Sequence, residues 1–534
     1  MRTVRLEGRG SVKFGGLRTI TAALALVAAA CSSSASDSTA GGNGSDPISS
    51  TAEVPATTSA PVTTTTIATT TTSTTAALST TTTSTAPPVV GDISWAPCGS
   101  GECGTLAVPL DHDDPGGETI DIAVSRFAST SPDRVGSLFI NFGGPSGETN
   151  EILAFSGPFY STLFDGRFDI IGWDPRATGE TAPLQCESFR DDDIGVGFID
   201  PGDGFTAELA EEEASFLELA ACAEASGPIV DHLSTSDVAS DLDLLRQAVG
   251  DDGLSYLGYS YGTQIGWVYA SLFPQNVRAM ILDGAVPPGS FGSAGLVEQY
   301  EGFERTFAEF DAVCNANAER CEQASEGLAT TVDRLTAELR ANPIQSNDGS
   351  SYTAEDFLEG VLITLYTEAG SSVPGLSRNI ASVDAGNPGP FIADAQSGNS
   401  SSTAGVYKAV NCADGFDVDS PEDSIAHLSE IVTVAPRFGQ INEGIRCDLW
   451  PGEIKGLPEL DTTGAPTLLV VGNTLDPATP YESAIELDDL LDDSVLLTYE
   501  GTGHTIVGRD GCIDAFALDY LVNLTPPPPG TTCP

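Results

Sequence analysis

The sequence predicts an α/β protein with a mostly parallel, doubly wound central sheet and a helical segment inserted into it. Short apolar strands alternate with amphipathic helices over residues 92–287, and the same alternation returns over 442–534. Between these parts, residues 288–441 show mostly helical periodicity with Gly- and Ser-rich breaks. Strands separated by helices pair in parallel, because each crossover returns the chain to the same end of the sheet. The inserted segment is expected to form a cap over a site, with a separate binding domain as the alternative.

The individual elements follow from this periodicity. The expected strands are 105–110, 120–127, 137–141, 168–174, 254–259, 277–283, 467–472 and 495–499. The expected helices of the sheet domain include 237–249 and 261–273. The inserted segment is expected to form helices at 296–314, 324–341 and 354–366.

Residues 1–30 have the parts of an export signal, a basic start followed by the apolar run 20–30. The basic residues are Arg2, Arg5, Arg9, Lys13 and Arg18. The apolar run is too short to span a bilayer as a mature helix. Cys31 directly follows three alanines, which resembles the lipobox of bacterial lipoproteins, so we expect Cys31 to be lipidated. The chain is then an exported lipoprotein on the outer face of the membrane, or released from it; the alternative is ordinary cleavage beside an incidental Cys.

The segment 31–91 is composed mainly of Ser, Thr, Ala, Pro and Gly. Such a composition buries too little apolar surface to offset the entropy of ordering, so we expect a disordered tether. The whole chain has 22 Lys and Arg against 76 Asp and Glu, a formal charge of −54. A surface this acidic repels nucleic acid and anionic membranes, which excludes both as partners.

Eleven cysteines are present, and ten remain once Cys31 is set aside. An exported protein folds in oxidising surroundings, where an even number of cysteines favours disulfides. The pairs that the spacing suggests are Cys98–Cys103, Cys186–Cys222, Cys314–Cys321, Cys412–Cys447 and Cys512–Cys533. The sequence shows no metal-ligand spacing with a nearby His, no phosphate loop and no cofactor motif, so we expect neither a metal nor a cofactor.

The segment 258–262 reads Gly-Tyr-Ser-Tyr-Gly and matches the nucleophile-elbow pattern G-x-S-x-G. It stands between an expected strand and an expected helix, where a sharp turn presents the Ser260 hydroxyl to a base. An elbow also predicts an oxyanion hole, formed by the N–H of Tyr261 and a donor from a loop after an earlier strand. The glycine loop after residue 141 fits, with Gly144 as the preferred donor and Gly143 as the fallback.

A serine nucleophile needs a base, and the sequence has four histidines. His112 lies among acidic residues, His232 precedes an expected helix, and His427 lies in a helical pattern of the inserted segment. His504 directly follows the last expected strand, where the chain order Ser, Asp, His places the base.

The acid that orients His504 is expected in the loop after the 467–472 strand. Asp476 lies in this loop, whereas Asp461 and Asp510 are less well placed relative to strand ends. A carboxylate at 476 can accept a hydrogen bond from the imidazole and stabilise its cation.

The chain from Trp95 to Cys533 resembles the secreted actinobacterial tripeptidyl aminopeptidase and proteinase group of α/β-hydrolases, relatives of prolyl aminopeptidases with a TAP-like C-terminal region. The stretches that carry the resemblance are CGTLAVPLDHDDPGGETIDIAVSR, FDIIGWDPRATGET, DVASDLDLLRQAVG, YLGYSYGTQIGWVYASLFPQNVRAMILDG, VVGNTLDPATPYE and GTGHTIV. The resemblance implies an α/β-hydrolase fold with a helical cap, the triad of Ser260, Asp476 and His504, and removal of short peptides from free N-termini.

Two motifs depart from the pattern of the group. Where its glycine loop reads N-P-G-G-P-G-G-S-G, this chain has Phe142, Ser146 and Glu148 in place of Pro, Gly and Ser. Where its later turn reads D-P-R-G, this chain has Ala177 in place of the Gly. These departures leave the expected triad intact and bear on substrate preference.

The function that follows is a serine hydrolase acting through an acyl-enzyme on Ser260, as an exported aminopeptidase. An aminopeptidase needs an anion for the substrate ammonium group, because an unpaired buried cation is costly. Candidates are Glu148, Glu180 and Asp414. The alternatives are a carboxylesterase or lipase on the same scaffold and, from another class, a non-catalytic surface binding protein.

Overall fold

The computed structural model describes most of the chain after the tether. The described residues are 91–185, 199, 202, 204–345, 351–389, 391, 401–417, 420–441 and 446–534. The expected leader, tether, Cys31 and Cys186 lie outside the described residues. Among the described residues, no helix has the length and apolar composition that a membrane crossing requires.

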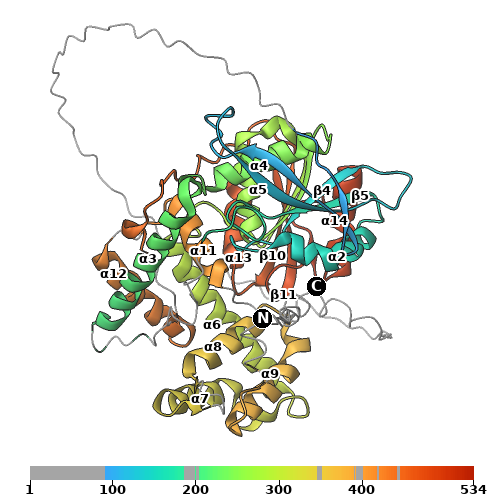
Figure 1. Ribbon diagram of the computed structural model, residues 1–534. Coiled ribbons are helices and arrows are strands. Elements are labelled where there is room, and N and C mark those ends of the chain that lie inside the picture. Colours follow the sequence, from blue (N-terminus) through green and yellow to red (C-terminus); the bar gives the residue numbers. More distant parts are fainter. Residues whose placement is uncertain are drawn as a thin grey trace, which may run out of the picture. The chain divides into compact units, whose positions relative to one another are not determined.

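A ten-stranded, mostly parallel sheet forms the centre of the sheet domain (Figure 1). Its strands, in spatial order, are β1 (Ala96–Cys98), β2 (Gly101–Pro109), β3 (Thr119–Phe127), β5 (Phe168–Trp173), β4 (Gly136–Asn141), β6 (Leu254–Tyr259), β7 (Val277–Asp283), β10 (Leu468–Leu475), β11 (Ser494–Thr502) and β12 (Thr532–Cys533). The pairs from β5 to β12 are parallel, whereas β1, β2, β3 and β5 pair in antiparallel fashion. The expected doubly wound sheet is confirmed, with an antiparallel edge added to it.

Helices cover both faces of the sheet. They are α2 (Thr149–Leu163), α3 (Thr206–Ser226), α4 (Thr235–Ala248), α5 (Tyr261–Leu272), α13 (Tyr481–Leu490) and α14 (Gly511–Asn523). Alternate strand residues point to opposite faces. Tyr256 and Leu282 pack with α4, α5 and α13, whereas Leu257 and Ile281 pack with α2 and α14.

The chain between β7 and β10 forms the helical cap segment, which is interrupted by undescribed residues. Its helices are α6 (Ser293–Ala316), α7 (Leu328–Ala341), α8 (Ala354–Thr364), α9 (Ala369–Asp384), α11 (Ser401–Ala413) and α12 (Pro421–Val434). A two-stranded ribbon consists of β8 (Ile344–Gln345) and β9 (Ser351–Tyr352). The short 3-10 turns of the chain are η3 (Gly227–Asp231), η4 (Pro274–Asn276), η5 (Glu322–Ser325), η6 (Phe438–Ile441) and η7 (Cys447–Leu449).

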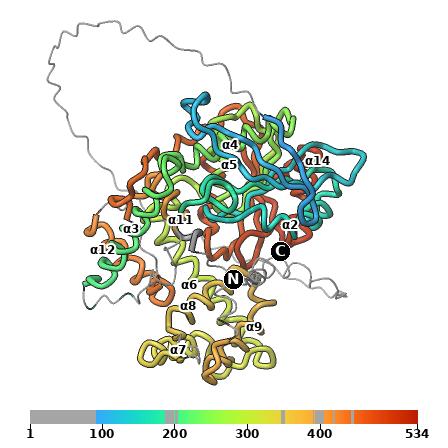
Figure 2. Tube along the Cα trace, in the orientation of Figure 1, coloured from blue at the N-terminus to red at the C-terminus, as the bar shows by residue number. Residues whose placement is uncertain are grey.

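The cap helices form two groups (Figure 2). Helices α6 to α9 share their own apolar core, which includes Phe307, Leu335 and Phe357. Helices α11 and α12 lie between this group and α3, and α12 contacts both α6 and α3. The helix expected at 324–341 begins only at Leu328, because Gly327 has φ 98° and separates it from the η5 turn.

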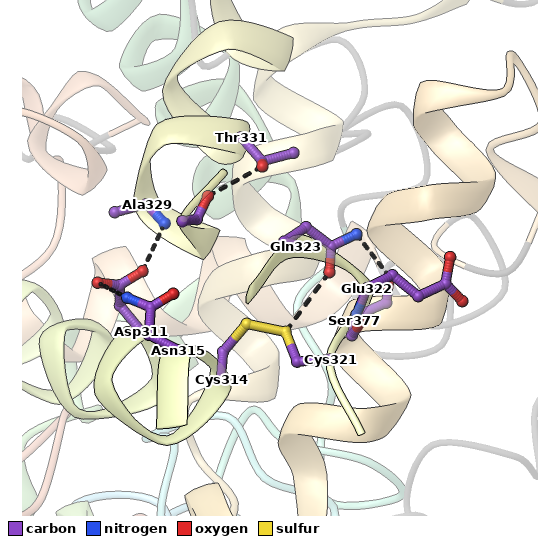
Figure 3. The surroundings of a disulfide bond; sticks show 10 residues. Asp311, Cys314, Asn315, Cys321, Glu322, Gln323, Ala329, Thr331 and Ser377 are labelled. Atoms are coloured by element: carbon purple, nitrogen blue, oxygen red, sulfur yellow. Dashed lines mark hydrogen bonds between the residues drawn. A yellow bond between two sulfur atoms is a disulfide. The ribbon is translucent and has the colours of Figure 1, made fainter. Parts of the chain in front are cut away.

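Disulfides join neighbouring elements in both parts. The structure contains Cys98–Cys103, Cys314–Cys321, Cys412–Cys447 and Cys512–Cys533. Cys222 is also disulfide-bonded. Figure 3 shows the Cys314–Cys321 bond, which ties the end of α6 to the η5 turn. Next to it, Glu322 N donates to Ser377 Oγ at 2.8 Å, so the turn is also anchored to α9.

Candidate active site

Ser260 occupies a sharp turn between β6 and α5. Its backbone has φ 55° and ψ −127°, a strained conformation for a residue with a side chain. A Cβ on Gly258 would lie 2.4 Å from the Gly262 oxygen, and one on Gly262 would lie 2.9 Å from the Asn141 oxygen. Both flanking positions therefore require glycine, as the G-x-S-x-G pattern predicts.

Hydrogen bonds hold this strained turn on both sides. Ser260 N donates to Asp283 O at the end of β7, at 2.9 Å. The Ser260 carbonyl accepts from Thr263 N and from Thr263 Oγ1, each at 2.7 Å. Because both backbone groups of Ser260 are engaged, the turn can keep its strain without unfolding locally.

The glycine loop after β4 lies directly on the Ser260 turn. A Cβ on Gly143 would lie 2.9 Å from Ser260 Cβ and 3.2 Å from Tyr261 N. The N–H of Gly143 donates to Asn141 Oδ1 at 2.9 Å, so this N–H is already engaged. The geometry favours Gly144 over Gly143 as the loop's oxyanion donor, beside the N–H of Tyr261 at the start of α5.

His504 and Asp476 are in direct contact at the carboxyl ends of β10 and β11. His504 Nδ1 lies 2.9 Å from Asp476 Oδ1 and 3.1 Å from Oδ2. Both residues are buried, at 8% and 3% exposure. With Nδ1 bonded to the carboxylate as a donor, Nε2 is left as the atom that can accept a proton.

Backbone donors fix the Asp476 carboxylate. Its Oδ1 accepts from the N–H groups of Ala478 and Thr479, both at 2.9 Å, and its Oδ2 accepts from Thr505 N at 3.2 Å. Together these three bonds hold both carboxylate oxygens in place. The carboxylate is thereby held in contact with His504 Nδ1.

The end of β7 brings the Ser260 turn and the His504 loop together. Asp283 O accepts from Ser260 N, and a Cβ on the next residue, Gly284, would lie 3.2 Å from His504 Cε1. Strands β6, β7, β10 and β11 are parallel neighbours, so their carboxyl ends lie at the same edge of the sheet. The three residues of the expected triad thus lie at one edge, around one residue of β7.

The cap also contacts the base directly. His504 N donates to Tyr366 O, after α8, at 3.0 Å, and the two rings meet edge to face at 5.2 Å between centroids. Ala369 N at the start of α9 donates to Thr502 Oγ1 at 2.8 Å. The cap therefore helps to fix the loop that carries His504.

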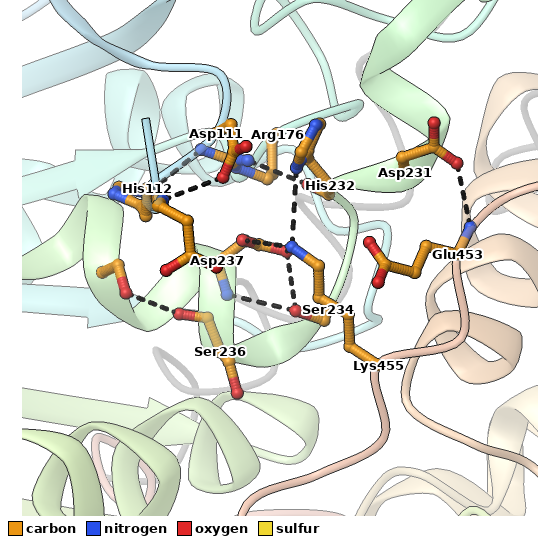
Figure 4. Close-up of polar contacts among 12 residues, drawn as sticks. Asp111, His112, Arg176, Asp231, His232, Ser234, Ser236, Asp237, Glu453 and Lys455 are labelled. Carbon is orange, nitrogen blue, oxygen red and sulfur yellow. Dashed lines mark hydrogen bonds and ion pairs between the residues drawn. The ribbon is translucent and has the colours of Figure 1, made fainter. Parts of the chain in front are cut away.

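The other three histidines lie in other surroundings. His112 Nε2 lies 2.9 Å from Asp241, which also binds the buried Arg176 through two contacts at 2.7 and 2.8 Å. His232 lies in the same polar cluster (Figure 4). His427 is buried on α12, where burial lowers its pKa. In the cluster of His112, Asp241 and Arg176, burial raises the pKa of Asp241, but the Arg176 guanidinium holds that pKa below its usual range.

The three candidate amine-binding acids separate into two places. Glu148 and Glu180 lie around Asp174, whose carboxylate accepts from Asn150 N at 3.0 Å and from Glu180 N at 3.2 Å. Burial raises the pKa of Glu148, and the neighbouring acids raise it further. Asp414 instead accepts from Thr235 N at 2.8 Å and Gln264 Nε2 at 3.0 Å, so its carboxylate links the cap to α4 and α5.

One group of acid and thiol residues gathers elsewhere, formed by Asp510, Cys512 and Cys533. Cys512 and Cys533 are joined to each other as a disulfide. This pairing leaves no free thiolate there to bind a metal.

Two residues of the site were not singled out from the sequence, Asp283 and Asn473. The Asp283 carboxylate accepts hydrogen bonds from the N–H groups of Ile506 and Val507. Asn473 donates to Gly503 O at 2.7 Å. Both occur at or near strand ends, in the segments LDG and VVGNTLD. Position at a strand end was the available signal, but only the folded chain shows which loop each side chain holds.

Known proteins similar to this chain include a protease, an esterase and an aminopeptidase. The family model described as TAP-like protein matches residues 436–533. The serine protease Hip1 of Mycobacterium tuberculosis is 34% identical over 480 residues, which cover 83% of this chain and 91% of that protein. Carboxylesterase B of the same organism is 32% identical, covering 81% of this chain and 86% of that protein. The tripeptidyl aminopeptidase of Streptomyces coelicolor is 29% identical, covering 80% and 84%.

Proposed function

We propose that this chain, which belongs to the α/β-hydrolase family of Hip1 and the tripeptidyl aminopeptidases, hydrolyses a peptide bond near a free N-terminus. The reaction proceeds through an acyl-enzyme on Ser260. The chain is a serine hydrolase by its family and fold. The observation that carries the proposed assignment of residues is the His504–Asp476 pair, buried beside the Ser260 turn.

In the first half of the reaction, Ser260 Oγ attacks the carbonyl carbon of the scissile bond while His504 Nε2 takes the hydroxyl proton. Asp476 stabilises the imidazolium through Nδ1. The N–H groups of Tyr261 and Gly144 receive the oxyanion of the tetrahedral intermediate. His504 then gives its proton to the leaving amine, and the C–N bond breaks.

In the second half, His504 Nε2 takes a proton from a water molecule, whose oxygen attacks the acyl carbon. The same two N–H groups receive the second oxyanion. The proton returns from His504 to Ser260 Oγ as the ester bond breaks, which releases the acyl peptide and restores the enzyme.

Acids near the glycine loop support a preference for a free amine. Glu148 directly precedes α2 without a side-chain capping bond, and its pKa is raised by burial and by the nearby acids Glu151, Asp174 and Glu180. Mutual repulsion of this kind is relieved when a cation binds among the carboxylates. The N-terminal ammonium group of a peptide is such a cation.

The test compares free and N-acetylated forms of one peptide anilide. The wild type is expected to prefer the free amine, and Glu148→Gln with Glu180→Gln should raise KM for that substrate only. Glu338→Gln, an exposed position on α7, serves as the matched surface control. Equal KM changes for both substrates would contradict the amine site, and product masses from a mixed peptide pool would give the cleavage position.

Ester hydrolysis is the second candidate, because one relative is named carboxylesterase B. The same triad and oxyanion donors serve both reactions, so the difference lies in the substrate contacts. Comparison of a peptide anilide with a short-chain nitrophenyl ester separates the two activities. A chain that reacts with neither, and that no fluorophosphonate labels, would instead be a binding protein.

We also propose that the exported chain is anchored to the membrane by lipid on Cys31. The support is the basic and apolar leader followed by three alanines and Cys31. Metabolic labelling with a palmitate analogue should mark the wild type and not Cys31→Ala. Label on both chains, or on neither, would contradict the anchor.

A further inference from the structure

Asp283 touches both halves of the catalytic apparatus. Its backbone carbonyl accepts from Ser260 N at 2.9 Å. Its side-chain Oδ2 accepts from Ile506 N at 2.8 Å and from Val507 N at 2.7 Å. Ile506 and Val507 are the second and third residues after His504, so one residue joins the nucleophile turn to the base loop.

The loop that Asp283 holds has a positive φ on both sides of His504 and is strained at one of them. Gly503 has φ 103° and Thr505 has φ 62°, and the second of these is unfavourable for a β-branched residue. A conformation of this kind persists only when its surroundings fix it. Asn473 holds the carbonyl groups of Gly503 and Thr505, while Asp283 holds the N–H groups that follow.

Asp283 is also a second buried carboxylate beside the imidazole. The residue has 0% exposure, and its Oδ1 has no hydrogen-bond partner among the described residues. Burial raises the pKa of Asp283 to about 6, and the charge of Asp476 also raises it. The two N–H donors and His504 act in the opposite direction and lower it. With a pKa of about 6 the carboxylate is mostly ionised at neutral pH, and it interacts electrostatically with His504.

Two buried phenols interact with Asp283, Tyr160 on α2 and Tyr259 on β6, and both also interact with Asp514 on α14. Burial raises the pKa of both phenols above the usual value, so both are neutral at the pH of the reaction. Tyr259 Oη donates to Val507 O at 3.0 Å and so holds the same loop. The charged groups near the imidazole are consequently Asp283, Asp476 and Arg509, whose guanidinium donates to His504 O at 2.9 Å and is unchanged in the variants tested below.

We infer that Asp283 is a positioning residue for the proposed reaction, which fixes the His504 loop and stabilises the His504 cation as a second carboxylate. Asp476 binds the imidazole directly, whereas Asp283 acts through the backbone of the loop and through its charge. This inference rests on the proposed function of Ser260, Asp476 and His504.

The test is the pH dependence of kcat/KM in Asp283→Asn. Loss of a nearby anion makes the imidazolium less stable, so the acidic limb of the profile should move to lower pH by roughly half a unit, a fraction of the shift of 1–3 units that a contacting charge produces. The kcat should fall, since the loop is held less firmly, and KM should change little. Asp283→Glu restores the charge and should return the limb toward the wild-type position.

Asp514→Asn is the matched control. Asp514 lies on α14, burial raises its pKa to about 6, and its carboxylate accepts from Gly508 N at 2.6 Å, on the same loop. His504 is not among the groups that shift its pKa. The control should lower thermal stability without moving the acidic limb.

Active-site titration with a fluorophosphonate relates each rate to folded enzyme and separates the two hypotheses. A wild type that is not labelled at Ser260 contradicts the proposed function itself. A labelled, active wild type with an unmoved limb in Asp283→Asn overturns only the inference on Asp283. An Asp283→Asn chain that gives no folded, labelled protein would show a role in folding alone and would also overturn it.

Discussion

Substitution of Gly143 by Ala tests whether the glycine loop and the nucleophile turn form one unit. A Cβ at this position would lie 2.7 Å from Tyr259 O and 2.9 Å from Ser260 Cβ. Neither neighbour can give way without moving the turn, since the first is backbone and the second is a rigid Cβ. The substitution should push Ser260 and the oxyanion donors apart by a few tenths of an ångström.

The matched control is Gly289→Ala. Gly289 has φ 91°, close to the 89° of Gly143, and nothing lies within 4 Å of its added Cβ. Both substitutions place a side chain at a similar positive φ, which costs about 1–2 kcal/mol. Only Gly143→Ala disturbs the site, so the comparison separates strain from displacement.

The assay measures kcat/KM on a peptide anilide, together with the thermal midpoint of each variant. Displacement by about 1 Å costs roughly 100-fold in rate, so the smaller shift in Gly143→Ala should cost roughly ten- to a hundred-fold. Gly289→Ala should keep nearly wild-type activity at a similar thermal midpoint. Equal activity in the two variants would refute the close contact between the loop and the turn.

Three further predictions follow from the same structure. Asp476→Asn should lower kcat by about 10⁴-fold with little change in KM, as loss of the orienting acid does elsewhere. Burial raises the pKa of Asp414 to about 7, above its unfolded value near 3.9. The protonated carboxyl therefore stabilises the fold fully below pH 3.9, and this contribution is lost as pH rises through 7. Between pH 4 and 8 the thermal midpoint of Asp414→Asn should fall less than that of the wild type. Removal of the Cys512–Cys533 bond, with a sequence separation of 21, should cost about 3 kcal/mol and leave kcat unchanged.

Much of the fold could be predicted because apolar alternation is a local signal. The strand expected at 254–259 is β6, and that expected at 277–283 is β7, residue for residue. The helix α3 was not predicted, since its sequence is rich in Ala and Glu and its apolar stripe is weak. The antiparallel edge could not be predicted either, because strand direction depends on which neighbour a strand finds in the folded chain.

The site divides in the same way between local and tertiary signals. The Ser260 turn is encoded by two nearby glycines, and the positions of Asp476 and His504 follow from the chain order of the fold. The engagement of the Gly143 N–H with Asn141 and the contact of Asp283 with the His504 loop depend on tertiary packing. No pattern in the sequence reveals such side-chain partners.

The central claim is that the Ser260 hydroxyl reacts because His504 removes its proton. The most direct measurement is the site and rate of fluorophosphonate labelling, read by peptide mass spectrometry, in the wild type and in His504→Ala. We expect the adduct on Ser260 in the wild type and a labelling rate lower by roughly a thousand-fold or more without the imidazole. An adduct on another residue, or equal rates in the two proteins, would contradict the account.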